Sequence, residues 1–261
     1  MSAEKLFSHF KEYNGEEIQT VKKIVELCEA SSKSHRMLTT AFLPPIFKKI
    51  IPEILRSYED LDFLVSGGYE DAEYFKVMVY PGYTSHEMAG IKVIKSTFNS
   101  KYGSLGHRDV LGALMGLGIK RQLIGDILVK DSTIQILVDE DMGAYIAAQL
   151  DKIGKVKVSS QLMDLDTLVY EPVSYEYSHQ TVSSLRLDTI ISSAFNMSRS
   201  KVVEAIKSEK VKLNHRVETS TSKLVVEKDL VSFRGQGRFI LDEVLGLSKK
   251  DRQKIIIKKY V

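Results

Sequence analysis

The chain has 261 residues, which is long for one compact core and predicts two or three small domains. It is 43% hydrophobic and 27% charged, a composition that excludes wholesale disorder. The first thirteen residues carry charges that a signal peptide lacks, and no apolar run approaches the length of a membrane span. We therefore expect a cytoplasmic protein without membrane contacts.

The single cysteine, Cys28, lies at helical spacing with Val21 and Ile24, which predicts a buried position in a helix. One cysteine excludes an internal disulfide and a zinc site built from cysteine pairs. A reducing compartment fits this usage.

The net charge of +3 is unevenly distributed along the chain. Residues 182–261 hold 17 Lys and Arg against 9 Asp and Glu, a surplus of eight positive charges. The remaining 181 residues hold 20 basic against 25 acidic side chains. This asymmetry indicates a module that binds a polyanion, joined to a mildly acidic body.

Residues 1–80 are expected to form a small α/β unit. Its predicted helices span residues 2–13, 16–30 and 46–56, the last after Pro44 and Pro45, which favour a helix start. Its predicted strands span residues 61–65 and 74–80, with a turn at Gly67 and Gly68 between them.

Residues 81–163 alternate between strand and helix patterns in the order βαββαβ. This is the ferredoxin-like order of RNA recognition motif domains, with strands predicted at residues 90–97, 124–130, 133–139 and 155–160 and helices at 108–117 and 142–153. Such domains bind RNA through aromatic side chains on the third strand. Residues 133–138 contain no aromatic residue, so we expect this RRM-like domain to act as a scaffold or docking module.

Residues 164–181 lose periodicity and predict a linker into the C-terminal module at 182–261. Two short amphipathic helices are predicted near residues 185–195 and 199–207, the second capped by Ser198. Short strands follow at residues 211–214, 217, 224–226 and 230–234. The lysine-rich tail, residues 249–259, could contact phosphates or form a solvated last helix. The predicted fold class is therefore α+β.

The segment from Arg186 to Phe239 resembles the RNA-binding domain named after small-subunit ribosomal protein S4. The resemblance rests on Arg186-Leu187-Asp188, on Ser198-Arg199 at the second helix start, and on the strand Val211-Lys212-Leu213-Asn214. The family usually has glycine before that strand and after the Asn, where this chain has Glu209 and His215.

A second resemblance covers essentially the whole chain. The string from Leu105 to Ile119, LGHRDVLGALMGLGI, with Gly125-Asp126-Ile127 after it, is similar to the YlmH family of Gram-positive bacteria. This resemblance implies a ribosome-associated factor of translation quality control that acts on stalled large subunits bearing peptidyl-tRNA. It also implies a gene that often lies near cell-division genes.

Cationic side chains displayed over two helices and a hairpin would meet phosphates and read the shape of structured RNA. Arg186 and Arg199, at the two helix starts, are expected at the centre of this surface and are not expected to be needed for folding. The full set of candidate RNA-binding residues is Arg186, Arg199, Ser200, Lys201, Lys207, Lys210, Asn214, Arg216, Lys223, Arg234 and Arg238.

Enzyme signals are weak. Arg186-Leu187-Asp188 is superficially similar to the catalytic motif of pseudouridine synthases, but here it opens the RNA-binding domain itself. His107-Arg108-Asp109 lacks the other kinase motifs, and we interpret it as a helix start in which Asp109 faces the positive end of the dipole. A surface that faces the ribosome remains an alternative for this triplet.

Glycines 112, 116 and 118 do not form a cofactor loop and are attributed to close packing. The six histidines show no metal-ligand spacing. We thus predict a non-catalytic protein without cofactor or metal, whose partners are rRNA or tRNA and the large ribosomal subunit. A monomer is expected. The alternatives are an RNA-modifying enzyme, of the pseudouridine synthase or methyltransferase type, and a cell-division interaction protein.

Overall fold

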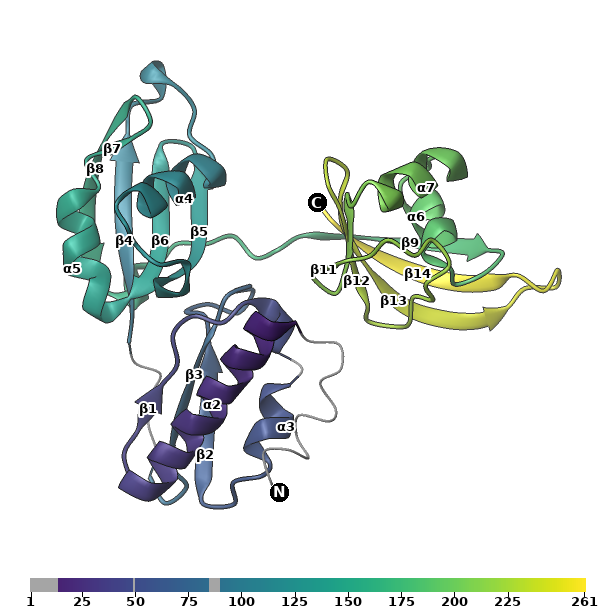
Figure 1. Cartoon of the computed structure of the whole chain (residues 1–261). Coiled ribbons are helices and arrows are strands. Elements are labelled where there is room, and N and C mark those ends of the chain that lie inside the picture. Colours follow the sequence, from purple (N-terminus) through teal and green to yellow (C-terminus); the bar gives the residue numbers. More distant parts are fainter. Residues whose placement is uncertain (1–13, 49, 85–89) are drawn as a thin grey trace. The chain divides into compact units, whose positions relative to one another are not determined.

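The computed structural model describes residues 14–48, 50–84 and 90–261 (Figure 1). The chain divides into two compact units, Met1–Tyr170 and Glu171–Val261. In the described residues, each unit combines helices with antiparallel sheets, which confirms the α+β class. The helix predicted at residues 2–13 lies outside the described residues.

The first unit begins with helix α2 (Gly15–Ser34). Its start is fixed by a reciprocal cap, since the Glu17 amide donates to the Asn14 side chain and the Asn14 amide donates to the Glu17 carboxylate. The helix packs against a three-stranded sheet of order β1-β3-β2, with β1 at Leu38–Thr39, β2 at Leu61–Ser66 and β3 at Lys76–Pro81. Cys28 is fully buried in this core, as predicted, and burial raises the pKa of its thiol to about 12.

The helix predicted at residues 46–56 is wrong in its extent. The structure has a single 3-10 turn, η1 (Pro45–Phe47), and a short helix α3 (Ile51–Leu55) with Pro52 in its first turn. Proline has no amide hydrogen and is tolerated only at a helix start, so Pro52 favours a new start at Ile51 over continuation from the preceding turn.

The second half of this unit forms a five-stranded antiparallel sheet of order β5-β6-β4-β8-β7. Two helices cover one of its faces (Figure 1). The chain order is β4 (Ile91–Phe98), η2 (Ser100–Tyr102), α4 (His107–Gly116), η3 (Arg121–Leu123), β5 (Ile124–Lys130), β6 (Thr133–Asp139), α5 (Glu140–Gln149), β7 (Lys152–Ile153) and β8 (Val156–Met163). Strands β5, β6, β4 and β8 reproduce the ferredoxin-like arrangement that the pattern predicts.

The helix predicted at residues 142–153 ends early, at Gln149. Lys152 and Ile153 instead pair with β8 through a turn at Gly154, which has a φ of 59°. Ile153 is fully buried among the residues under the two helices, so its apolar side chain enters the same core from a strand.

The other face of this sheet is covered near Leu137. Phe42 and Leu165 pack with it, and an added Cβ at Gly125 would lie 2.7 Å from the Phe42 ring. The Val169 amide donates a hydrogen bond of 2.9 Å to the Gln135 side chain. An RNA recognition motif stacks bases on this face of its sheet. Here, other residues of the same chain cover part of that face.

Buried polar contacts join the two halves of the first unit. The Asp126 carboxylate accepts hydrogen bonds from the Tyr69 hydroxyl and from the amides of Glu73 and Tyr74, at 2.8, 2.8 and 3.0 Å. Lys76, only 4% exposed, pairs with Asp139 at 2.8 Å. Because a buried charge is costly without its partner, these contacts specify how the two halves meet.

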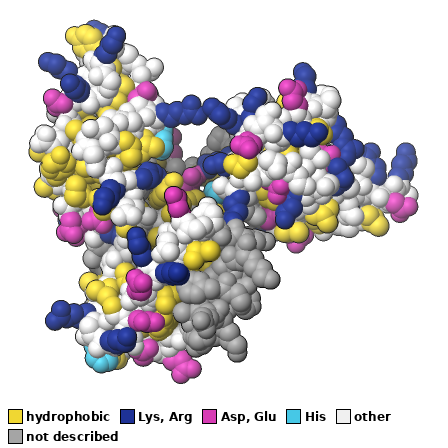
Figure 2. All heavy atoms as spheres, viewed as in Figure 1, with side chains coloured by type: hydrophobic (Ala, Val, Ile, Leu, Met, Phe, Trp, Pro, Cys, Tyr) yellow, Lys and Arg dark blue, Asp and Glu magenta, His cyan; other side chains and the backbone are white. Residues whose placement is uncertain are grey.

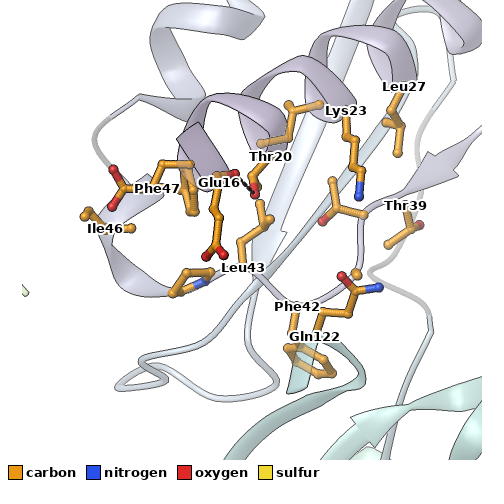
Figure 3. Close-up of a pocket in the computed structure, with 15 residues that line it drawn as sticks. Glu16, Thr20, Lys23, Leu27, Thr39, Phe42, Leu43, Ile46, Phe47 and Gln122 are labelled. Atoms are coloured by element: carbon orange, nitrogen blue, oxygen red, sulfur yellow. Dashed lines mark hydrogen bonds between the residues drawn. The ribbon is translucent and has the colours of Figure 1, made fainter. Parts of the chain in front are cut away.

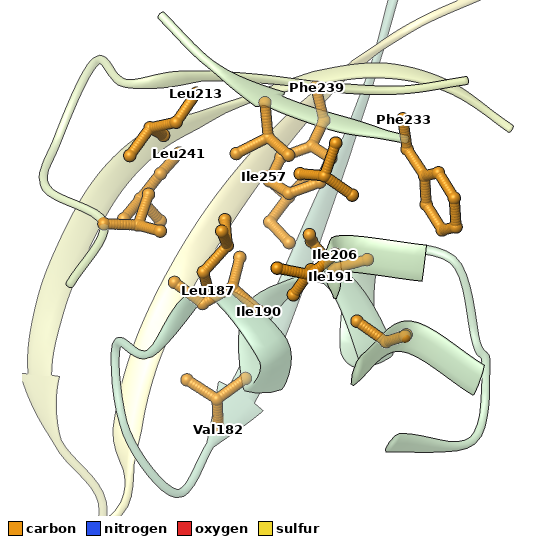
Figure 4. Packing of buried hydrophobic residues seen from close by; sticks show 14 of the residues in the cluster. Val182, Leu187, Ile190, Ile191, Ile206, Leu213, Phe233, Phe239, Leu241 and Ile257 are labelled. Atoms are coloured by element: carbon orange, nitrogen blue, oxygen red, sulfur yellow. The ribbon is translucent and has the colours of Figure 1, made fainter. Parts of the chain in front are cut away.

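The second unit is a six-stranded antiparallel sheet of order β11-β10-β12-β13-β14-β9, with two helices on one face. Figure 4 shows Leu187, Ile191 and Ile206 of the helices packed against Phe239 and Ile257 of the sheet. Its elements are β9 (Tyr175–Val182), α6 (Leu187–Ala194), α7 (Arg199–Lys207), β10 (Val211–Leu213), β11 (Arg216–Val217), β12 (Leu230–Phe233), β13 (Gly237–Leu247) and β14 (Gln253–Tyr260).

The linker predicted at residues 164–181 is wrong over most of its length. Leu165–Thr167 form a 3-10 turn, η4, and Tyr175–Val182 form strand β9, which pairs with β14 over eight positions. The lysine-rich tail is not the solvated helix that was one alternative. Residues 253–260 form strand β14, in which Ile255 and Ile257 are buried at alternating positions. Residues 224–226 form no ladder strand, and Leu224 makes one isolated bridge to Arg186.

The two departures from the S4-type pattern keep the backbone that glycine would favour. Glu209, two residues after the end of helix α7, has a φ of 57°, and the amides of Glu209 and Lys210 donate to the carbonyls of Ile206 and Ala205. This is the Schellman arrangement, which usually has glycine at this position. Asn214 and His215 both have positive φ in the two-residue turn between β10 and β11.

Candidate nucleic-acid interface

A buried carboxylate organises the two helix starts of the second unit. Asp188, in the first turn of α6, is 2% exposed. Arg186, directly before α6, donates from Nε and Nη2 to the two carboxylate oxygens, both at 3.1 Å. Arg199, the first residue of α7, donates from Nε and Nη2 to Oδ2 at 3.0 and 2.9 Å. One carboxylate therefore fixes both guanidinium groups.

The charges of this cluster depend on each other. Burial raises the pKa of the Asp188 carboxyl, but the hydrogen bonds from Arg186 and Arg199 outweigh that effect and hold the pKa below its usual range. Hydrogen bonding to Asp188 likewise raises the pKa of Arg186. The cluster therefore has one buried negative and two positive charges. The arginine side chains remain 37% and 56% exposed, so each also presents a surface to solvent.

This geometry argues against the expectation that neither arginine is needed for folding. Removing one guanidinium would leave a buried carboxylate with half of its charged partners. Sequence reasoning used Asp188 as part of the S4-type motif and as a possible catalytic group, although its spacing in Arg186-Leu187-Asp188 was the available signal for an ion pair.

Two groups of the predicted residues gather on the second unit. The first surrounds the helix starts. Lys223 lies beside Arg186, because the Leu187 amide donates to the Lys223 carbonyl at 2.8 Å, and Ser200 and Lys201 are exposed in the first turn of α7.

The second group lies past the end of α7, where the Arg234 amide donates to the Lys210 carbonyl at 2.8 Å and Lys207 is in the last helical turn. Figure 2 shows Lys and Arg side chains spread over the visible face of this unit.

Three predicted residues do not join these groups. Asn214 donates to the buried Asp229 at 2.7 Å and accepts from the Leu230 amide at 3.1 Å, so its side chain holds the β10–β11 turn against β12. Arg216 lies on the edge strand β11. Arg238 points away from the helices, and its guanidinium lies 4.5 Å from the centroid of the Tyr260 ring.

The structure gives little support to catalysis. Asp188 is enclosed by two arginines, which leaves its carboxylate without access to a base in RNA. Within residues 14–48, 50–84 and 90–261, no three His, Cys, Asp or Glu side chains are placed to hold a metal ion. Asp109 caps α4, as expected, by accepting a hydrogen bond of 2.8 Å from the Gly106 amide.

The glycines near α4 do not pack closely, contrary to the sequence interpretation. A Cβ added at Gly112, Gly116 or Gly118 would meet nothing within 4 Å. Gly118 has a φ of 79°, which explains glycine at that position. Nothing in the structure explains Gly112 and Gly116.

A pocket of about 360 Å³ lies in the first unit beside α2 (Figure 3). Its wall is mixed, with Phe42, Leu43 and Phe47 beside Glu16, Lys23 and Gln122. The titratable side chains that line it, Glu16, Glu17 and Lys23, all lie on α2. We assign no chemistry to this pocket.

Comparisons with known proteins bear on these features. The family model described as "YlmH, N-terminal" matches residues 16–84, and the model described as "Putative RNA-binding domain in YlmH" matches residues 85–167. The S4 domain model matches residues 185–231. The chain is 34% identical over 258 residues to "Ribosome-associated protein quality control protein P2" of Bacillus subtilis (strain 168), covering 97% of this chain and 98% of that protein.

The chain belongs to the YlmH family. A solved structure of a relative, "Cell division protein ylmH from Streptococcus pneumoniae", has 27% identity and a TM-score of 0.52, covering 60% of this chain and 97% of that one. The match to the S4 domain model lies within residues 182–261, where the sequence of this YlmH-family chain predicts an RNA-binding domain. For the middle domain, the family description names RNA as a putative ligand, so the scaffold role stays a prediction. No helix in the described part of the chain is long and apolar enough to cross a membrane.

Proposed function

We propose that this YlmH-family protein holds structured rRNA or tRNA on the large ribosomal subunit, without modifying it, during quality control of stalled nascent chains. The observation that carries the proposal is the pair of guanidiniums fixed by Asp188 at the starts of α6 and α7. Amides at a helix start and fixed, partly exposed arginines together make a site for phosphate oxygens.

The surrounding charge supports RNA over a small anion. Residues 182–261 have a surplus of eight positive charges, and the basic groups lie at both ends of the nine-residue helix α7, which is about 13 Å long at 1.5 Å per residue. Contacts of this kind recognise the shape of a folded RNA more than its sequence. The name of the Bacillus subtilis relative supports a ribosome-associated setting.

The non-catalytic part of the proposal rests on the enclosure of Asp188. A pseudouridine synthase needs a carboxylate that reaches its substrate, whereas this one is 2% exposed and receives hydrogen bonds from two arginines. We further propose that the protein acts as a cytoplasmic monomer.

Sedimentation with purified ribosomal subunits tests the proposal. The full chain is expected to pellet with large subunits and to crosslink to rRNA or tRNA, and a Lys207→Ala, Lys210→Ala, Arg234→Ala variant is expected to lose most of this binding. Lys250→Ala, in the exposed turn between β13 and β14, is the charge control. Binding that is indifferent to the triple change would refute the group beyond α7 as part of the RNA-binding surface.

Two further measurements separate the alternatives. Mass spectrometry of RNA nucleosides after incubation, with and without S-adenosylmethionine, should show no new modified nucleoside, and a new one would establish an enzyme instead. A protein that crosslinks in cells to division proteins but not to RNA would support the cell-division alternative suggested by the name of the Streptococcus pneumoniae relative.

A further inference from the structure

The sheet of the second unit has a face that points away from α6 and α7. Ile255 and Ile257 of β14 are buried beneath the helices, so alternation along the strand places Lys258 and Tyr260 on the opposite face. Their register partners on β9, Tyr177 and Tyr175, share that face. Arg238 of β13 also lies there, because it contacts the Tyr260 ring.

These five side chains form a continuous strip across three strands. The Tyr175 and Tyr260 rings lie 5.0 Å apart between centroids, at an interplanar angle of 66°. Lys258 Nζ lies 3.8 Å from the Tyr175 centroid and 5.7 Å from that of Tyr177. The Arg238 guanidinium lies over Tyr260, so each cation of the strip lies over a tyrosine ring.

The face that carries the strip is basic. Among the paired strand residues, register assigns Lys212, Arg238, Lys254 and Lys258 to this face, against the single carboxylate of Glu243. A net positive charge next to aromatic rings disfavours a purely apolar partner and complements a polyanion that also carries flat rings. Tyr177 is 56% exposed, so most of this side chain is available to a ligand.

We propose that this strip of Arg238, Tyr260, Tyr175, Lys258 and Tyr177 binds single-stranded RNA, with unpaired bases on the tyrosines and phosphates on the cations. Single-strand binding proteins combine a basic track with aromatic side chains on which bases stack. The inference deepens the proposed function, since it gives the domain a second RNA face. The helix starts would hold folded RNA, and the opposite face of the sheet would hold an adjoining unpaired segment.

Tyr177→Trp gives a direct probe, because the natural sequence contains no tryptophan. Titration of the full-length variant with a twelve-nucleotide oligouridylate is expected to quench the tryptophan emission, as stacking on a base does. Heparin, a polyanion without bases, is the matched ligand control. Equal quenching by heparin, or none by the oligonucleotide, would overturn the proposal.

Affinities of the full-length protein for the oligouridylate and for an rRNA stem-loop complete the test. Tyr177→Ala should weaken oligouridylate binding about tenfold, from the roughly 1–3 kcal/mol that one stacked base contributes. Tyr177→Phe should retain it, and Tyr102→Ala, an exposed tyrosine of the first unit, is the aromatic control. Stem-loop binding should be unchanged in all three variants.

The outcomes separate this inference from the proposed function. If stem-loop binding is intact and the oligouridylate does not bind, or binds equally to wild type and Tyr177→Ala, the strip is not a single-strand site, while the helix-start surface stands. If the oligouridylate binds through Tyr177 and the stem-loop does not bind at all, the strip is supported and the proposed function fails.

Discussion

Arg199, at the start of α7, donates two hydrogen bonds to Asp188, at the start of α6, at 3.0 and 2.9 Å. The contact joins two helix starts that are eleven residues apart in sequence and fixes a guanidinium that is still 56% exposed. The same side chain can therefore stabilise the domain and contact a phosphate.

Arg199→Ala should lower the free energy of unfolding of the second unit by roughly 1–2 kcal/mol, because the buried Asp188 carboxylate keeps only Arg186. Urea denaturation followed by circular dichroism measures it. Lys201→Ala, an exposed change two residues further along α7, should stay within about 0.5 kcal/mol of the wild type. If both variants unfold at the same urea concentration, the ion pair does not stabilise the fold.

The depressed pKa of Asp188 predicts a pH dependence. A carboxyl with a lower pKa in the folded state binds fewer protons there than in the unfolded chain, so its contribution is present above the ordinary value of 3.8 and is lost as pH falls below it toward the folded value. Thermal melts between pH 7 and pH 2.5 should show this loss in the wild type. Asp188→Asn should be less stable at neutral pH and should lack this part of the acid dependence. A variant with the same acid dependence would contradict the assignment.

Lys223→Ala should weaken RNA binding with little effect on folding, because the hydrogen bond from Leu187 uses the Lys223 backbone carbonyl. If the surface neutralises about five phosphates, log affinity should fall with log salt at a slope of roughly −3.5 to −4.5. Losing one contact should flatten the slope by about 0.7–0.9. Fluorescence anisotropy at several salt concentrations measures the slope, with Lys250→Ala as the charge control. An unchanged slope in Lys223→Ala would place this lysine away from RNA.

A fragment of residues 171–261 should be more stable than one of residues 182–261. The shorter fragment lacks most of β9, which makes eight register pairs with β14, and it exposes β14 as a new edge. From typical cross-strand contributions, the loss is roughly 2 kcal/mol or more. Urea denaturation compares the two fragments, and a fragment of residues 165–261 is the control that should add nothing further. Equal stability of all three would show that β9 contributes no net stability.

Glu209→Gly should stabilise the domain by about 1 kcal/mol. Glu209 has a φ of 57° at the end of α7, a conformation that a side chain with a Cβ disfavours and glycine adopts readily. Glu204→Gly, inside the same helix, is the control and should destabilise by about 1 kcal/mol. Thermal denaturation compares the two variants, and a shift of the same sign in both would contradict the turn argument.

The sequence by itself determined the elements with strong local signals. The ferredoxin-like strand order, the buried face around Cys28 and the helices at Leu187–Ala194 and Arg199–Lys207 follow from periodicity, which is a property of neighbouring residues. Ser198 stands at the predicted N-cap position of α7, but its side chain makes no capping hydrogen bond. The S4-type motif likewise marked the RNA-binding domain before any contact was visible.

Only the tertiary structure decided what depends on distant residues. Strand β9 has no apolar alternation of its own, and its pairing partner β14 lies some eighty residues later in the chain. Sequence reasoning therefore missed the strand and the tyrosines on it. Asn214 and Arg238 look like any other polar candidates in the sequence, yet one holds a turn and the other lies on the far side of the sheet. A cation appears in the sequence only as a charge, whereas its role depends on its partner, which for Arg186 and Arg199 is one buried carboxylate.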